Sequence, residues 1–87
     1  MDVREQFGRI LKGIRTSREM TQEELSFRAG MNVTYLSDLE RGRSNPSLAM
    51  LIDLARALRV HPAELLKDLV LDESDASPTS RKRPADH

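Results

Sequence analysis

The stretch TQEELSFRAGMNVTYLSDLERG, residues 21–42, contains the signals for two short helices separated by a glycine. Thr21 is followed three residues later by Glu24, which is the spacing of a capping box. In that motif the threonine hydroxyl accepts from the glutamate amide, and the glutamate carboxylate accepts from the threonine amide. Gly30 is expected to end this first helix, because glycine adopts the left-handed conformation of a helix C-terminus at little cost.

Asn32 starts the second helix of this stretch, since an asparagine side chain caps a helix N-terminus well. The helix is expected from Val33 to about Glu40, closed by Gly42. Two short capped helices joined by a glycine-containing turn match the geometry of a helix-turn-helix, whose second helix enters the major groove of DNA. The spacing alone is a weak signal, because many pairs of packed helices share it.

The residues before this stretch predict one amphipathic helix. Its apolar stripe consists of Val3, Phe7, Ile10, Leu11 and Ile14. Asp2 stands before the stripe and Glu5 follows three residues later, which fits an N-terminal cap. Gly8 and Gly13 lower the helix propensity, so this helix is expected to depend on packing for its stability.

The residues after the stretch predict two further helices. Ser47 caps a fourth helix behind Asn45-Pro46. Its broad apolar face comprises Leu48, Leu51, Ile52, Leu54, Ala55 and Leu58. Pro62 fits the first turn of a fifth helix, with His61 as its cap rather than as a ligand or base.

These elements define the fold class as all-α, a compact domain of five short helices over residues 1–71. After Leu71 the chain contains no aliphatic residue larger than alanine and has two prolines. Residues 72–87 are therefore expected to form a disordered tail. The basic run Arg81-Lys82-Arg83 follows an acidic patch and favours a solvated tail over an arm that binds DNA.

The composition excludes several classes of protein. The 87 residues carry 14 Lys+Arg and 14 Asp+Glu, so the net charge is zero and one domain is expected. Cysteine is absent, which excludes disulfides, thiolate zinc sites and cysteine nucleophiles. With two histidines and no visible nucleophile–base set, we expect no metal, no cofactor, no catalytic residue and no enzyme. No apolar run approaches the roughly 18 residues needed to span a bilayer, and no signal peptide is visible, so a cytosolic protein without a membrane partner is expected.

The stretch from Ile10 to Leu66 resembles the lambda-repressor-like helix-turn-helix family, also called the Cro/Xre family. The resemblance is carried by LKGIRTSREMTQEELSFRAG, then MNVTYLSDLERGRSNPSLAMLIDLARAL, then VHPAELL. It implies a compact five-helix domain with the helix-turn-helix at residues 21–41. It also implies that the protein binds double-stranded operator DNA as a twofold dimer.

Five residues match the positions that this family uses against base edges: Asn32, Val33, Thr34, Ser37 and Asp38. Asn32 and Thr34 can hydrogen-bond bases, and Val33 or the Thr34 methyl group can pack on a thymine methyl group. Asn32 could instead act only as a cap, and Asp38 could either accept from cytosine N4 or hold a neighbouring arginine. No arginine or glutamine stands at the front of this helix, so the operator sequence is not readable from it.

Six residues match positions beside the DNA backbone: Gln22, Tyr35, Arg41, Arg43, Ser44 and Asn45. Gln22 opens a helix whose free amides and dipole favour a phosphate, although a merely tolerated polar residue is the alternative. Tyr35 is expected to pack partly against the domain with its hydroxyl free to reach a phosphate, or to serve the core alone. A solvated charged loop is the alternative for residues 41–45.

Two further groups have structural roles. Arg15 and Glu40 match a family pair that forms a partly buried salt bridge between the first and third helices, with no base contact. Leu65, Leu66, Leu69, Val70 and Leu71 exceed what one helix stripe buries in so small a domain. Some of them are expected to form a twofold contact, because half-sites about 34 Å apart require two recognition helices held in register. Ordinary core with a frayed end is the alternative.

The sequence therefore predicts a sequence-specific double-stranded DNA-binding transcriptional regulator. We expect a repressor that acts as a homodimer on a pseudopalindromic operator, without a small-molecule ligand. A controller of a restriction-modification operon and an antitoxin are alternatives within the same family. A protein-interaction domain on the same scaffold is the alternative from another class, because a fold alone does not fix function.

Overall fold

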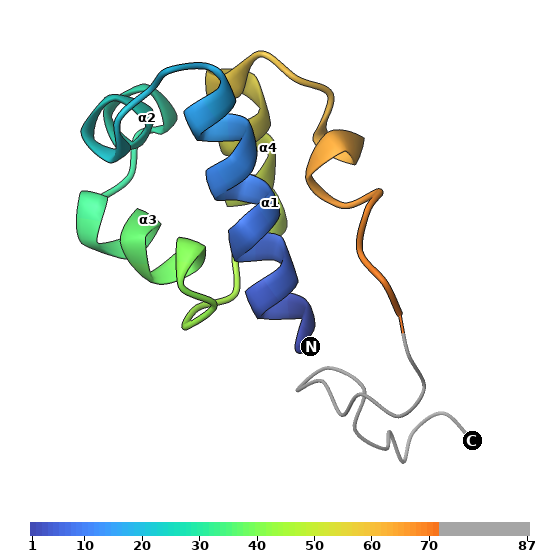
Figure 1. The fold of residues 1–87 in the computed structure, drawn as a ribbon. Coiled ribbons are helices and arrows are strands. Elements are labelled where there is room, and N and C mark those ends of the chain that lie inside the picture. The colour runs from blue at the N-terminus through green and yellow to red at the C-terminus, as the bar shows by residue number, and fades with distance from the viewer. Residues whose placement is uncertain (72–87) are drawn as a thin grey trace.

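The computed structural model describes residues 1–71, which fold into four α-helices followed by a 3-10 turn (Figure 1). In chain order they are α1 (Val3–Ser17), α2 (Gln22–Ala29), α3 (Val33–Glu40), α4 (Leu48–Leu58) and η1 (Pro62–Leu65). The all-α class is confirmed. None of the helices in this part of the chain is long and apolar enough to cross a membrane. The expected tail, with its basic run at residues 81–83, lies outside the described residues.

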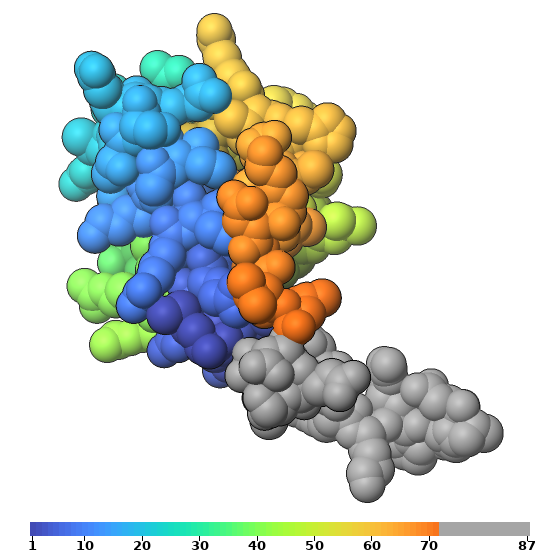
Figure 2. Space-filling model, turned by 45° about the vertical axis from the view of Figure 1, so that its right-hand side comes forward, coloured from blue at the N-terminus to red at the C-terminus, as the bar shows by residue number. Residues whose placement is uncertain are grey.

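The expectation of a fifth α-helix is wrong. His61 does cap this element, because its Nδ1 accepts from the Ala63 amide at 2.9 Å, but the element is a 3-10 turn of four residues. In an α-helix the Val70 amide would bond to the carbonyl four residues earlier. Here the amide donates instead to the Gln6 side-chain oxygen at 2.8 Å, and the Val70 carbonyl accepts from Gln6 Nε2 at 3.1 Å. Residues 66–71 therefore lie along α1 and do not continue the helix (Figure 2).

The predicted caps of the helices are present. At α2 the Thr21 hydroxyl accepts from the Glu24 amide at 3.0 Å, and the Glu24 carboxylate accepts from the Thr21 amide at 2.9 Å. Gly30 ends α2 in the left-handed region, with φ of 72°. Ser47 caps α4 by accepting from the Met50 amide at 3.1 Å.

The cap of α1 changes the ionisation of its residue. Asp2 accepts from the Arg4 amide at 2.6 Å. This hydrogen bond to the backbone, assisted by the Arg4 side chain, holds the pKa of the Asp2 carboxyl below its ordinary value.

The core is built from leucine side chains that all elements contribute. Those buried almost completely are Leu11, Leu25, Leu36, Leu39, Leu54, Leu58 and Leu65. Phe7 is the one buried aromatic side chain among residues 1–71. Because Leu65 comes from η1, the short turn closes the core although it forms no α-helix.

Two glycines bring α1 against the end of α3 and the loop that follows it. A Cβ atom on Gly8 would lie 2.5 Å from the carbonyl oxygens of both Leu39 and Glu40. A Cβ atom on Gly42 would lie 2.9 Å from the Cα of Glu5, and Gly42 also has a positive φ of 77°. Backbone therefore touches backbone at this junction, which fixes α1 and α3 relative to each other.

Candidate DNA interface

The helix α3 buries one face and presents the other to solvent. Leu36 and Leu39 are fully buried, whereas Asn32, Val33 and Thr34 at the helix start are exposed. Ser37 and Asp38, one turn further on, are half-buried. All five residues predicted to face bases thus remain open to solvent, at least in part, along the start of one helix.

Asn32 caps α3 in the structure. Asn32 Oδ1 accepts from the Thr34 amide at 2.6 Å. The side-chain NH₂ group stays available as a donor, and purine N7, guanine O6 and thymine O4 all accept in the major groove. A capping role and a base contact are therefore compatible in the same side chain.

Asp38 forms no ion pair with an arginine in the part of the chain that the structure describes. Its carboxylate takes part in none of the ion pairs among residues 1–71, which are formed by other side chains. Its backbone carbonyl accepts from the Arg43 amide at 2.9 Å and so helps to shape the loop after α3. The carboxylate is left with the role of an acceptor, which suits the amino group of cytosine.

The loop after α3 carries two exposed arginines. Arg41 and Arg43 are exposed, as is Asn45, and Ser44 is half-buried. The Tyr35 hydroxyl donates to the Asn45 carbonyl at 3.0 Å. This bond ties the loop to α3 and uses the hydroxyl proton, so a donation from Tyr35 to a phosphate would require the bond to be exchanged.

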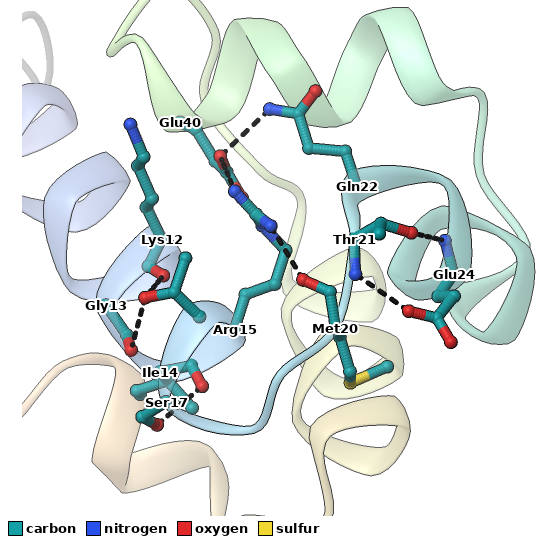
Figure 3. Close-up of polar contacts among 11 residues, drawn as sticks. Lys12, Gly13, Ile14, Arg15, Ser17, Met20, Thr21, Gln22, Glu24 and Glu40 are labelled. Carbon is teal, nitrogen blue, oxygen red and sulfur yellow. Dashed lines mark hydrogen bonds and ion pairs between the residues drawn. The ribbon is translucent and has the colours of Figure 1, made fainter.

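A buried network connects the start of α2 with the end of α3 (Figure 3). Arg15 Nε donates to Glu40 Oε2 at 2.7 Å, and Arg15 Nη2 donates to Oε1 at 3.1 Å. The same guanidinium donates to the Met20 carbonyl at 2.7 Å. The structure therefore contains the salt bridge that the family resemblance implied.

Gln22 joins this network, which the sequence did not indicate. Its Nε2 donates to Glu40 Oε1 at 2.9 Å, so one carboxylate oxygen receives both Gln22 and Arg15. Gln22 and Glu40 lie 18 residues apart on two different helices, so no pattern within one helix could reveal the contact. Gln22 keeps a second side-chain N–H group, and the capping box does not use the backbone amides of Gln22 and Glu23 in the first turn of α2. These groups are the donors that an anion meets at a helix N-terminus.

One residue assigned to the dimer surface has a different role. Leu65 is 0% exposed and lies in the core, so its assignment to a subunit contact is wrong. Leu69 is half-buried and packs against the core, whereas Leu66, Val70 and Leu71 are exposed. The physical reason is the 3-10 turn, which directs Leu65 inward and leaves the residues after it along the surface.

The exposed leucines border an apolar groove that includes a residue we did not expect. Its apolar lining comprises Val3, Phe7, Pro46, Leu48, Leu51, Leu66 and Leu69. Leu48 belongs to the broad apolar face that the sequence predicts for this helix, but it is 76% exposed. It occupies the first position of α4, directly after the Ser47 cap, and that position turns away from the core.

The fold and the surface together define a helix-turn-helix protein. The two short helices α2 and α3 pack against each other, the start of α3 is exposed, and a loop with two arginines follows α3. A helix-turn-helix family model matches residues 11–65. The chain belongs to this helix-turn-helix family (HTH_3).

Named relatives agree with the family. An uncharacterized HTH-type transcriptional regulator, y4dJ of Sinorhizobium fredii, is 44% identical over 66 residues, covering 76% of this chain and 86% of the relative. The control protein C.BamHI of Bacillus amyloliquefaciens is 41% identical over 66 residues, covering 75% and 82%. The crystal structure of the restriction-modification controller protein C.AhdI from Aeromonas hydrophila superimposes with a TM-score of 0.72 at 38% identity, covering 72% and 96%.

Proposed function

We propose that this protein is a sequence-specific DNA-binding transcriptional regulator that represses its promoter as a homodimer on a pseudopalindromic operator. The observation that carries the proposal is the solvent-exposed start of α3, with the Asn32 amide and the Thr34 hydroxyl free to read bases. The relatives are named as transcriptional regulators and control proteins, which supports regulation rather than catalysis. Such a protein works in the cytoplasm, where it has access to the nucleoid.

Contacts to phosphates would position α3 in the groove. Gln22 and the free amides at the start of α2 suit one phosphate, and Arg41 and Arg43 suit others along the same strand. These contacts carry no sequence information, whereas the side chains of α3 carry it. Specificity therefore comes from the side chains of α3, and affinity comes from the loop and the start of α2.

The apolar groove supports the homodimer. Leu48 and Leu66, which line it, are 76% and 43% exposed, which is a cost that a second copy of the chain would remove. A twofold contact there would hold two α3 helices for half-sites about 34 Å apart.

Control of a restriction-modification operon is the second candidate. Similarity to C.BamHI and to C.AhdI favours it, since both are named as controllers. A restriction or modification gene beside the coding gene would support this candidate, and a different neighbourhood would favour a stand-alone repressor.

Selection of bound sites from random duplex DNA tests the proposed function. We expect enrichment of two inverted half-sites whose centres lie about 10 base pairs apart or a multiple of it. If no sequence is enriched over the unselected pool, sequence-specific binding is wrong and the protein-interaction alternative gains support.

Salt dependence provides a second measurement on the same protein. If each subunit contacts about four phosphates, the slope of log K against log salt should be near −7 for a dimer. A slope near zero with both random and genomic DNA would contradict DNA binding altogether.

A further inference from the structure

Four cationic side chains surround one hollow between α1 and the loop after α3. Arg9 and Lys12 belong to α1, and Arg41 and Arg43 belong to the loop. Arg9 and Lys12 lie one helical turn apart, so both face the same side of α1. The helix-turn-helix motif accounts for the loop arginines but gives no role to the pair on α1.

The side chains that line the hollow carry a net positive charge. None of these four side chains forms an ion pair among residues 1–71. Two carboxylates also line the hollow, but that of Glu40 is already paired with Arg15. Among residues 1–71, Glu5 is therefore the one carboxylate lining the hollow that has no ion pair, and it opposes four cations.

The two halves of the cluster are held rigidly together. Gly8 of α1 touches the backbone carbonyls at the end of α3, and Gly42 touches the backbone of Glu5. Arg9 and Lys12 thus keep a fixed position beside the loop. In Figure 3 the Lys12 side chain extends toward the same side of the molecule as Glu40 and Gln22, which is where a phosphate would meet the start of α2.

We propose that Arg9 and Lys12 bind the DNA phosphate backbone, extending the contact surface from the loop after α3 onto α1. This inference rests on the proposed function. The partner is a polyanion with closely spaced charges, because neighbouring cations that repel one another are stabilised together when several phosphates lie across them. Both side chains belong to α1, which contacts the end of α3 and not its exposed start, so they suit phosphates rather than base edges. The α1 pair therefore adds affinity without adding sequence preference.

The test compares the salt dependence of three full-length proteins on a random-sequence duplex. They are the wild type, the double variant Arg9→Gln/Lys12→Gln, and the control Arg56→Gln/Arg59→Gln. The control removes the same charge from exposed positions at the end of α4, which lie outside the hollow. Affinity is measured by fluorescence anisotropy between about 50 and 200 mM salt, where counterion release dominates.

The double variant should bind more weakly at low salt, and its slope should be shallower by about 2 for each bound subunit. The control should keep the wild-type slope. Exchanging the two cations, Arg9→Lys/Lys12→Arg, should also keep the slope, because a positive charge at each position is sufficient. Circular dichroism melting checks the fold of every variant. Little change is expected, because all four side chains are exposed and the one ion pair that they form within residues 1–71, Arg56 with Asp53, is itself exposed.

Three results would overturn the inference. Equal slopes for the wild type and the double variant would show that the α1 pair makes no phosphate contact. Equal losses in the double variant and the control would assign the effect to net charge. If the wild type shows no salt-dependent binding to any duplex, the proposed function fails together with this inference, which separates that failure from the first two.

Discussion

Glu40 is the residue at which three helices meet through one carboxylate. It lies at the end of α3, its salt bridge leads to α1, and its bond to Gln22 leads to α2. The side chains of Arg15 and Glu40 are 10% and 3% exposed. A pair this deeply buried fixes geometry more reliably than it adds stability, because desolvation offsets much of the attraction.

Removing one partner of this pair should be costly. We expect Glu40→Ala to lower the free energy of unfolding by about 3–5 kcal/mol, because Arg15 would remain as a buried, unpaired charge. Urea denaturation measures the change. Asp53→Ala is the matched control, since the exposed pair of Asp53 with Arg56 should contribute less than about 1 kcal/mol. Equal stability of Glu40→Ala and the wild type would reject the structural role.

Side-chain capping could be predicted from the sequence because its hydrogen bonds join residues two or three positions apart. Thr21 and Glu24 show this, and the structure confirms their capping box. The contact of Gln22 with Glu40 could not be predicted in this way, because it depends on the packing of α2 against α3. The base and phosphate contacts stay predictions, and the structure supports them only through the exposure of their side chains.

At the scale of the element, α1 contains two glycines with opposite surroundings. Helix propensity does not distinguish Gly8 from Gly13, because either glycine weakens a helix. The structure separates them, because a Cβ atom on Gly8 would meet two carbonyl oxygens whereas one on Gly13 would meet nothing within 4 Å. Gly8 therefore permits the contact of α1 with α3, and Gly13 has no comparable packing role.

Alanine at these two positions should change stability in opposite directions. Gly13→Ala should stabilise the protein by about 0.5–1 kcal/mol, because alanine loses less entropy in a helix. Gly8→Ala should destabilise it, because rigid backbone carbonyls cannot move aside. Thermal melting of both variants measures the difference. A Gly8→Ala variant as stable as Gly13→Ala would contradict the close approach of α1 and α3.

The fifth element shows where a local pattern was insufficient. Proline at its first turn and the His61 cap correctly place its start. Its end depends on the bonds between Gln6 and Val70, which join residues 64 positions apart. No pattern within the segment 62–71 contains that information, so the helix predicted from the sequence was too long.

At the scale of the whole molecule, the neutral net charge conceals an uneven distribution. The 14 basic and 14 acidic residues cancel in sum. Cations nevertheless gather between α1 and the loop after α3, whereas the exposed Leu48 and Leu66 line the apolar groove on another part of the surface. One surface thus suits a polyanion and the other suits a second subunit.

A single charged side chain placed in the groove should prevent formation of the proposed homodimer. Leu48→Glu should give a monomer, because a carboxylate would be buried in the contact, while the fold persists since a glutamate suits the first turn of α4. Sedimentation equilibrium at micromolar concentration measures the mass. Phe27→Glu is the matched control, because Phe27 is 86% exposed on α2 and does not line the groove. A wild type that remains monomeric with and without DNA would reject the dimer.

The pairing of Gln6 with Val70 gives this small domain two levels of local stability. Residues 66–71 contain no fully buried side chain, so detaching them breaks few contacts and leaves the leucine core folded. The Val70 amide should therefore exchange with deuterium far faster than the Leu54 amide, which requires opening of the core. A second subunit seated over this segment would slow exchange at Val70 and leave Leu54 unchanged. Slower exchange of the Val70 amide would thus report dimer formation in residues 66–71, the segment of lowest local stability.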